Sequence, residues 1–361
     1  GAMLTSSGQA ASLLAILNLC SAGDSFIAAS TIYGGTINLF GVTLKKLGIE
    51  CIWVDPLADE ETISQAIKPN AEEIQKLFKP NTKAVFGETL ANPALTVFDI
   101  QKWAAIAHKN GVPLIIDNTF ATPILCRPIE WGADIVIHST TKYMDGHAVQ
   151  GGGVIVDGGR FDWAASGKFP DFTEPDESYH GVVYTREFGS MAYIIKARMQ
   201  LMRDFGCYPA AHSAFLLNLG LETLPVRMKR YCENALTVAA HLQASDKIAS
   251  VRYPALPGNE HYERAQKYLP LGTSGVMSVD IKGGRSAAMQ FMDSLQLACN
   301  EVHVADIRTC VLHPASETHR QLTDEQLVAA GIEPGLVRVS VGLENVEDII
   351  ADLDQALAQL G

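Results

Sequence analysis

The residues best suited to chemistry stand at the ends of short apolar runs. In "ADIVIHSTTKYMDGH", residues 133–147, the apolar residues 135–137 predict a buried strand that leads into Ser139, Thr141 and Lys142. Lysine is seldom fully buried without a partner. A lysine held away from water has a lowered pKa, which makes its amine nucleophilic toward a carbonyl group and able to form a Schiff base. Lys142 is therefore the first candidate for a catalytic residue.

Two other apolar runs also end in polar residues. Residues 114–116 precede Asp117, and residues 84–86 precede Glu88 and Asn92. A single aspartate after a strand is more often a turn or helix cap than a catalytic group. However, the carboxyl ends of strands in a doubly wound sheet meet at one edge, where such sheets bind their ligands. The joint occurrence of these residues favours one shared site.

The aldehyde of pyridoxal phosphate (PLP) is a carbonyl group that fits this set. The cofactor needs an anion near its pyridine nitrogen so that the ring stays protonated and accepts electrons, and Asp117 suits that place. It also needs a phosphate cradle. The segment "TSSGQAA" offers the Ser6 and Ser7 hydroxyls and the Gly8 and Gln9 amides at the start of a helix, where free N–H groups favour anions.

Further side chains complete the expected cofactor site. Ser139 and Thr141 add hydroxyl donors for the phosphate. Tyr33, followed by a glycine pair in "TIYGGT", can place its ring against the pyridine face. We therefore expect each part of PLP to have a partner in this chain. The histidines, by contrast, match no metal-ligand spacing, and we expect no metal site.

The elements that must position these residues alternate between strand and helix patterns. Strands are predicted at residues 26–29, 51–54, 84–86, 114–116, 135–137 and 154–156, with helices at 9–19 and from Asp99 to Gly111. Continuous apolar strands separated by helices predict an α/β fold with a mostly parallel sheet covered by helices. Residues 58–79 have a helical pattern and are interpreted as a local insertion, and residues 157–190 predict a long loop.

The second half of the chain differs in its pattern. A helical pattern extends to about Leu242, and strand patterns then return at residues 275–281, 309–312 and 336–341, with a helix near 286–295. We predict a large domain at residues 1–245 that binds the cofactor. A smaller α+β domain at 246–361 would lie on the substrate side.

Composition narrows the class of partner. The 28 basic and 40 acidic residues give a formal net charge of −12, which argues against nucleic acid or an anionic membrane surface. The 7 cysteines have no paired spacing and are typical of free thiols in the cytoplasm. The sequence contains no apolar run long enough for a membrane span. We expect a cytoplasmic enzyme that acts on small molecules.

The motifs "SSGQAA", "YGGT", "ETLANP", "DNTFATP", "HSTTKYMDGH" and "GLVRVSVGLE" together resemble the cystathionine γ-synthase group of fold-type I PLP-dependent enzymes. The resemblance extends from residue 1 to the C-terminus. It implies that Lys142 binds the cofactor covalently and moves protons, while Asp117 pairs with the ring nitrogen. It also implies that Asn92 pairs with the phenolic oxygen of the cofactor and that Tyr33 stacks on its ring and assists catalysis.

The resemblance assigns the remaining groups as well. Phosphate binding falls to Ser7, Gly8, Gln9, Ser139 and Thr141. Arg338 in "LVRVS" would bind the substrate α-carboxylate through two hydrogen bonds. His303, Asn92 and Tyr33 would also line the substrate site. Where similar enzymes read "NIGD", this chain reads "HVAD", so His303 replaces an asparagine.

Two features favour one branch of the family. Methionine-splitting members resemble this chain but carry "YGCT", with a cysteine at the place of Gly35. The segments at residues 167–184 and 303–322 resemble O-acetylhomoserine sulfhydrylases. The resemblance thus implies a transferase of methionine biosynthesis that converts O-acetyl-L-homoserine and sulfide, or a small thiol, to homocysteine, or methionine, and acetate. The alternative is cystathionine γ-synthase or methionine γ-lyase activity.

The resemblance further implies a homotetramer built as a dimer of dimers, with active sites shared between chains. Family members carry an arm before the position of Gly1, and we expect such an arm here. A nucleotide-binding oxidoreductase is disfavoured because no G-x-G-x-x-G follows the first strand. An inactive scaffold is disfavoured by the presence of Lys142, Asp117 and Tyr33. The preferred nucleophile and leaving group stay open.

Overall fold

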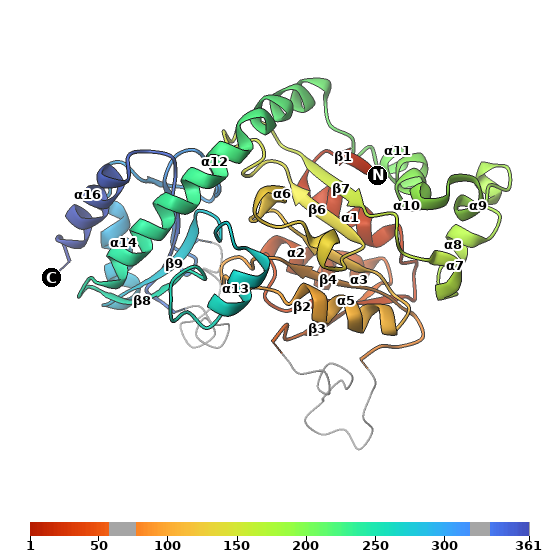
Figure 1. Cartoon of the computed structure of the whole chain (residues 1–361), viewed down its shortest axis with the longest axis horizontal. Coiled ribbons are helices and arrows are strands. Elements are labelled where there is room, and N and C mark those ends of the chain that lie inside the picture. The colour runs from red at the N-terminus through yellow and green to blue at the C-terminus, as the bar shows by residue number, and fades with distance from the viewer. Residues whose placement is uncertain (58–76, 318–332, 361) are drawn as a thin grey trace, which may run out of the picture.

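The computed structural model describes residues 1–57, 77–317 and 333–360. These residues form a seven-stranded sheet and a five-stranded sheet, which lie side by side along the long axis of the molecule (Figure 1). Helices pack around both sheets, so the α/β prediction is confirmed. The expected helical insertion at 58–79 lies outside the described residues up to position 76, as does part of the segment 303–322.

The first sheet has the strand order β1-β7-β6-β5-β4-β2-β3. Its strands are β1 (Ala2–Thr5), β2 (Ser25–Ala29), β3 (Glu50–Val54), β4 (Thr82–Glu88), β5 (Leu114–Asp117), β6 (Ile135–Ser139) and β7 (Gly153–Asp157). Strand β7 is antiparallel to β6 and β1, whereas the other pairs are parallel. The prediction of a mostly parallel sheet is therefore confirmed. The carboxyl ends of β4, β5 and β6 share one edge.

The helices near this sheet begin where the sequence provides caps. Helix α1 (Gly8–Leu17) begins after Ser7, whose hydroxyl accepts the Ala10 N–H at 3.0 Å. Helix α5 (Ile100–Lys109) begins after Asp99 in the same way. Shorter helices connect the strands: α2 (Gly34–Asn38), η1 (Leu39–Thr43), α3 (Leu44–Lys46), α6 (Thr122–Leu125) and η2 (Pro128–Trp131).

The prediction of a long loop at 157–190 is wrong. Short helices occupy this segment: α7 (Trp163–Ser166), α8 (Pro170–Thr173), η3 (Glu177–Tyr179) and α9 (Tyr184–Phe188). The aromatic side chains explain the difference, because the ring of Trp163 stacks on Phe172 at 4.7 Å and on Tyr193 at 5.6 Å between centroids. The following helices are η4 (Gly189–Met191), α10 (Ala192–Lys196), η5 (Ala197–Met202) and α11 (Arg203–Phe205).

The second sheet has the order β10-β11-β12-β9-β8. Its strands are β8 (Ile248–Arg252), β9 (Val276–Ile281), β10 (Cys299–Asn300), β11 (Cys310–Leu312) and β12 (Leu336–Ser340). The helices of this half are α12 (Ala211–Gln243), α13 (Tyr262–Tyr268), α14 (Gly284–Asp293) and α16 (Val346–Leu357). The strands predicted at 275–281, 309–312 and 336–341 and the helix near 286–295 are confirmed.

Each sheet has its own hydrophobic core, and the 33-residue helix α12 contributes to both. Met228 and Tyr231 belong to the core of the first sheet, whereas Val238 and Leu242 belong to the core of the second. The helix crosses from one half to the other in Figure 1. The proposed domain boundary at 245/246 falls between α12 and β8, and it stays a prediction. None of the helices within the described ranges is long and apolar enough to cross a membrane.

Candidate active site

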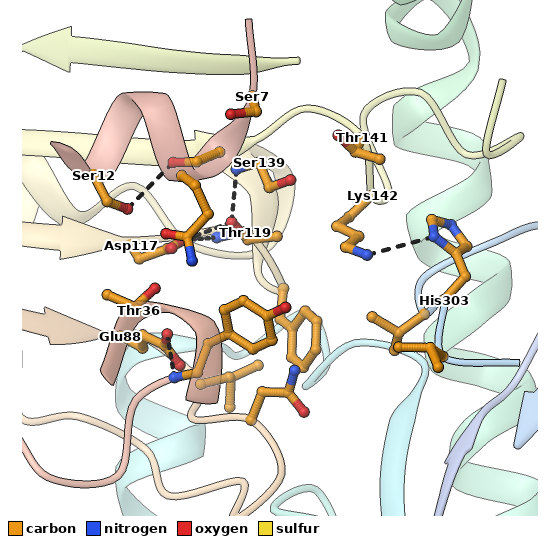
Figure 2. A pocket seen from close by; sticks show the side chains of 18 of the residues that line it. Ser7, Ser12, Thr36, Glu88, Asp117, Thr119, Ser139, Thr141, Lys142 and His303 are labelled. Carbon is orange, nitrogen blue, oxygen red and sulfur yellow. Dashed lines mark hydrogen bonds between the residues drawn. The ribbon is translucent and has the colours of Figure 1, made fainter. Parts of the chain in front are cut away.

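A cavity of about 400 Å³ lies at the carboxyl ends of β4, β5 and β6 and is closed on the other side by β12 and residues 302–304. Figure 2 shows polar side chains from both walls pointing into it. All of the predicted site residues line it: Ser7, Gly8, Gln9, Tyr33, Asn92, Asp117, Ser139, Thr141, Lys142, His303 and Arg338. The hydroxyl-bearing Ser6, also considered for the phosphate cradle, is not among the lining residues.

Lys142 is positioned by the segment that follows β6. Its backbone N–H donates to the Ser139 carbonyl at 3.4 Å, so the chain turns tightly after the strand. Helix α12 holds the next residues, because Arg227 Nη1 donates to the Tyr143 carbonyl at 2.7 Å and its Nη2 to that of Met144 at 3.3 Å. The lysine thus stands on backbone that is fixed from two sides.

Burial and the positive charge of Arg338 lower the pKa of Lys142 to about 8. At pH 7 about a tenth of this amine is therefore unprotonated, far more than for a lysine in water. An unprotonated amine is a nucleophile and a base. The chemistry expected of Lys142 from the sequence is thus compatible with its surroundings.

Asp117 ends β5 with one carboxylate oxygen occupied. Its Oδ1 accepts the backbone N–H of Thr119 at 2.9 Å and the Thr119 hydroxyl at 2.5 Å. The Thr119 Oγ1 in turn accepts the Ser139 N–H at 2.8 Å, so Asp117 is tied to the end of β6. Burial raises the pKa of Asp117 to about 6. A cationic partner in the cavity would reverse that effect and stabilise the carboxylate.

Glu88 is the neighbour of Asp117 across the β4–β5 pair. Burial, and then the charge of Asp117, raise the pKa of Glu88 well above its ordinary value. Two adjacent buried carboxyls do not both ionise readily, and the raised pKa favours the uncharged form of Glu88. Its Oε1 accepts the Tyr33 backbone N–H at 2.8 Å and thereby fixes the start of α2.

The start of α1 lies directly against Ser139. A Cβ atom on Gly8 would come within 2.6 Å of the Ser139 Cβ, so only glycine permits this approach. The first N–H groups of a helix have no partner within the helix. The Gly8 and Gln9 amides and the hydroxyl of Ser139 therefore converge on the same end of the cavity. Thr141 lies near this end and bonds to Gly152 across the turn.

Tyr33 lies at the start of α2 and keeps 48% of its surface exposed. A Cβ atom on Gly35 would meet the Tyr33 ring at 2.5 Å and the Gln9 amide nitrogen at 2.7 Å. The missing side chain at position 35 therefore leaves room for the tyrosine ring over the cavity. This observation gives a physical meaning to the "YGGT" motif.

The opposite wall carries Arg338 and His303. Arg338 lies on β12 and is 6% exposed, and its Nη2 donates to the carbonyls of Val302 at 2.9 Å and His303 at 3.1 Å. His303 Nδ1 lies 3.4 Å from Lys142 Nζ, and the two side chains face each other across the cavity in Figure 2. The structure thus joins residues that are far apart in the sequence.

Comparison with known proteins identifies the family. A family model described as "Cys/Met metabolism PLP-dependent enzyme" matches residues 1–358. The chain belongs to this family of PLP-dependent enzymes. It is 43% identical to an O-acetyl-L-homoserine sulfhydrylase from Leptospira meyeri, over 99% of this chain and 80% of that protein. It is 44% identical to a homocysteine synthase from Schizosaccharomyces pombe, over 99% of this chain and 81% of that protein.

Solved structures agree with this family assignment. A crystal structure from Campylobacter jejuni that contains N'-pyridoxyl-lysine-5'-monophosphate matches with a TM-score of 0.91 and 36% identity, over 99% of this chain and 82% of that chain. A structure of O-acetylhomoserine sulfhydrylase from Wolinella succinogenes matches with a TM-score of 0.81 and 30% identity, over 99% and 91% of the two chains. The resemblance inferred from the motifs and the PLP dependence are therefore confirmed.

The residues of this PLP-dependent enzyme fit the cofactor. The cavity contains the Lys142 amine with its lowered pKa, and within the described residues Asp117 Oδ2 and the Gly8 and Gln9 N–H groups have no hydrogen-bond partner. The Gln9 Oε1 atom is buried without a hydrogen-bond partner among the described residues, as expected where a polar ligand is to bind. No group of three or more His, Cys, Asp or Glu in the described part of the chain is arranged to bind a metal ion.

Some functional residues of the enzyme were not predicted. Thr119 holds both Asp117 and Ser139, and its signal is the spacing "DNT", in which a residue two positions after an aspartate donates back to it. Phe120 and Thr36 also line the cavity, but they carry no signal in the sequence. Glu88 was noted at a strand end, whereas its contact with Tyr33 was not foreseen.

Proposed function

We propose that this enzyme catalyses γ-replacement on O-acetyl-L-homoserine. Sulfide replaces acetate at Cγ to give homocysteine, and a small thiol replaces it in the same way, so that methanethiol gives methionine. The observation that carries this proposal is the convergence, in one cavity, of an amine of lowered pKa, Asp117, the start of α1 and Arg338. The names of the relatives at 43% and 44% identity support the choice of reaction.

The cofactor would be held by groups from the first sheet. Gly8, Gln9, Ser7, Ser139 and Thr141 would bind its phosphate. The free oxygen of Asp117 would face the ring nitrogen, where a cation restores the low pKa of the carboxyl. Asn92 would donate to the phenolic oxygen, and the ring of Tyr33 would stack on the pyridine. The Lys142 amine would bind the aldehyde covalently.

PLP, when bound, supplies an aldehyde that condenses with amines and a ring that withdraws electrons from the substrate. The chain supplies the proton transfers. Released by the incoming amino group, Lys142 Nζ would take the proton from Cα, a step for which a pKa of about 8 suits a base near neutral pH. Lys142 would next act at Cβ, and Tyr33 would assist near the leaving acetate.

The amino acid substrate would be oriented by the second wall. Arg338 presents a planar pair of donors that matches a carboxylate, and its burial strengthens that interaction. Its existing bonds to the Val302 and His303 carbonyls use Nη2 only. Nε and Nη1 form no hydrogen bond within the described residues and would bind the α-carboxylate. His303, Asn92 and Tyr33 would line the rest of the substrate site.

The alternative reactions on this scaffold are cystathionine synthesis and methionine splitting. Glycine at position 35 disfavours the second, because the ring of Tyr33 occupies the space that a cysteine side chain needs. Cystathionine synthesis differs in the nucleophile, which is the larger thiol cysteine, and can differ in the leaving group. An assay that varies the nucleophile and the leaving group independently will therefore distinguish these reactions.

Steady-state assays test this proposal directly. The PLP-loaded enzyme is given O-acetyl- or O-succinyl-homoserine with sulfide, methanethiol or cysteine, and products are separated by chromatography. We expect kcat/KM to be highest for O-acetyl-L-homoserine with sulfide. A preference for cysteine with the succinyl ester would instead indicate cystathionine γ-synthase activity. Release of methanethiol from methionine without added nucleophile would indicate a lyase.

We also propose a homotetramer, arranged as a dimer of dimers, in the cytoplasm. Apolar side chains exposed along α12, among them Phe215, Leu219 and Val226, support coverage by a second copy. The cysteines of the described ranges are free, which supports a reducing compartment. Light scattering coupled to gel filtration would measure the assembly, and a monomer at micromolar concentration would exclude it.

A further inference from the structure

His303 lies in the segment before β11, on the wall opposite Lys142. Its Nδ1 atom is 3.4 Å from Lys142 Nζ, and no other side chain stands between them in Figure 2. The side chain of His303 is 16% exposed, so little water competes for this contact. The histidine therefore touches the one amine on which the proposed reaction depends.

The far edge of the imidazole faces a carboxylate. Nε2 of His303 lies 3.8 Å from Asp306 Oδ2 and is buried without a hydrogen-bond partner among the described residues. Asp306 is 1% exposed, and Arg308 donates to it from its backbone N–H at 2.9 Å and from Nε at 3.0 Å. Although burial acts in the other direction, these bonds hold the pKa of Asp306 below its ordinary value.

This arrangement selects one tautomer of the imidazole. The Asp306 carboxylate, 3.8 Å from Nε2, favours the tautomer with its hydrogen on Nε2, which leaves the lone pair of Nδ1 directed at Lys142. Burial and the charge of Lys142 lower the pKa of His303 to about 4, so the ring is neutral near pH 7. A neutral acceptor can bond to the lysine both as an ammonium and as an amine.

The backbone of His303 is fixed independently of its ring. Arg338 Nη2 donates to the carbonyls of Val302 and His303, and Cys310 Sγ contacts the His303 carbonyl at 3.6 Å. The charged and titratable groups around the ring are Lys142, Asp306, Arg308, Cys310 and Arg338. Backbone and ring are thus both restrained, as a residue that orients another requires.

We propose that His303 is a positioning residue for Lys142. Its Nδ1 accepts a hydrogen bond from Lys142 Nζ whenever that amine is not bound to the cofactor, and Asp306 sets the ring orientation that allows this bond. The inference rests on the proposed role of Lys142 and goes beyond the assignment of His303 to the substrate site. A lysine side chain has many rotamers, so a fixed acceptor keeps the free amine beside the reacting atoms between proton transfers.

The test compares His303→Leu, which removes the acceptor, with His303→Asn, whose amide oxygen can take the place of Nδ1. We expect kcat of the leucine variant to fall about tenfold with KM changed less than about twofold, and the asparagine variant to recover most of the loss. His241→Leu, a partly exposed histidine near the end of α12 that pairs with Asp354 and does not line the cavity, is the matched control and should behave as the parent enzyme. Melting temperatures of all variants exclude misfolding.

A second measurement needs no amino acid substrate. PLP is added to apoprotein at a series of pH values, and the rate of covalent capture is followed by visible absorbance. Loss of the acceptor disfavours the ammonium form, so the midpoint of this pH profile should move downward in His303→Leu and stay near the parent value in His303→Asn. Borohydride reduction and peptide mapping confirm that Lys142 is the residue modified. Capture at another lysine would overturn the role of Lys142 instead.

Asp306→Asn tests the other half of the proposal. Alone, it should lower kcat by a factor of a few, because the ring loses its preferred orientation. In the His303→Leu background it should add nothing, since its effect passes through the imidazole. An equal loss in both backgrounds would contradict the coupling. A raised KM with unchanged kcat and unchanged capture profile in His303→Leu would show that His303 only binds substrate and would overturn the proposal.

Discussion

The two walls of the cavity are held in different ways. On the wall from the first sheet, polar groups follow the strands directly, and contacts over short sequence distances fix them, as Thr119 fixes Asp117. On the wall from the second half, Arg338 and His303 are linked to each other through backbone carbonyls. In our proposal the first wall holds the groups that bind PLP, whereas Arg338 on the second wall orients the amino acid. Under that proposal the two walls differ in their main task, although Tyr33 and Asn92 of the first wall would also line the substrate site and His303 of the second would position Lys142.

The largest effect is expected at the residue between the two walls. Lys142→Ala removes the amine that we propose binds the cofactor and moves protons, so turnover should fall by at least about 1000-fold. The visible absorbance of the lysine-bound cofactor should also disappear. Both are measured on protein dialysed with PLP. An unchanged spectrum would contradict the assignment of Lys142.

The first wall is tested by Asp117→Asn. Asparagine still accepts from Thr119 but carries no charge to face the ring nitrogen, so kcat should fall about 100-fold. Glu88→Gln is the matched control at the neighbouring strand end. Because burial and the charge of Asp117 raise the pKa of Glu88 and so favour its uncharged form, replacement by the neutral glutamine should change kcat less than about twofold. Equal losses in the two variants would mean that both carboxyls are ionised.

The second wall is tested by Arg338→Ala. Loss of a paired donor to the α-carboxylate should raise KM by about 10- to 100-fold. Cofactor content should stay near that of the parent enzyme, since the arginine belongs to the substrate side. Arg338→Lys keeps the charge without the planar pair of donors and should lie between the two. If Arg338→Ala lost cofactor to the same extent as it lost substrate binding, Arg338 would not belong to the substrate site alone.

The pH dependence of cofactor capture follows from the pKa of Lys142. Because burial lowers that pKa to about 8, the reactive unprotonated amine is in the minority below this pH and predominates above it. Capture of PLP by apoprotein should therefore speed up about tenfold between pH 7 and pH 9. Stopped-flow absorbance measures this rate. A profile that rises only above pH 10 would indicate an amine open to water.

The smallest effect on kcat is expected at Gly35, which lies against the ring of Tyr33. Gly35→Cys places a side chain where the tyrosine ring now lies, so the ring must move and kcat for γ-replacement should fall about fivefold. Gly35→Ala is the control, because it adds a Cβ without a thiol. A gain of methionine splitting in the cysteine variant alone would assign the difference to the thiol.

The difference between the two walls also explains which site residues could be predicted from the sequence. Lys142, Asp117 and Ser139 were predictable from the residues alone because apolar runs mark buried strands and polar residues follow them. The start of α1 was predictable because its cap and glycine are local features. Arg338 and His303 were predicted only through resemblance to a family, because strand β12 and the segment before β11 meet Lys142 through tertiary packing. No local sequence pattern predicts this contact between distant segments.

Other features escaped prediction for the same reason. Thr119 could be assigned its role only once the distance between the ends of β5 and β6 was known. Asp306 could be assigned its role only once the orientation of the His303 ring was known. The helices at 157–190 form because aromatic side chains from separate turns stack, as Trp163 does on Tyr193. The glycine and proline residues of this segment predicted a loop. Burial of its aromatic rings stabilises short helices instead.

The long helix α12 packs into both hydrophobic cores, and the cavity lies between the strand ends of the first sheet and β12 of the second. An amino acid anchored at Lys142 on one side and at Arg338 on the other would therefore act as a brace between the halves. Substrate analogues should accordingly stabilise the whole chain against heat rather than one half of it, by mass action on the folded state. The free energy of unfolding of both halves would then rise together as the site is filled.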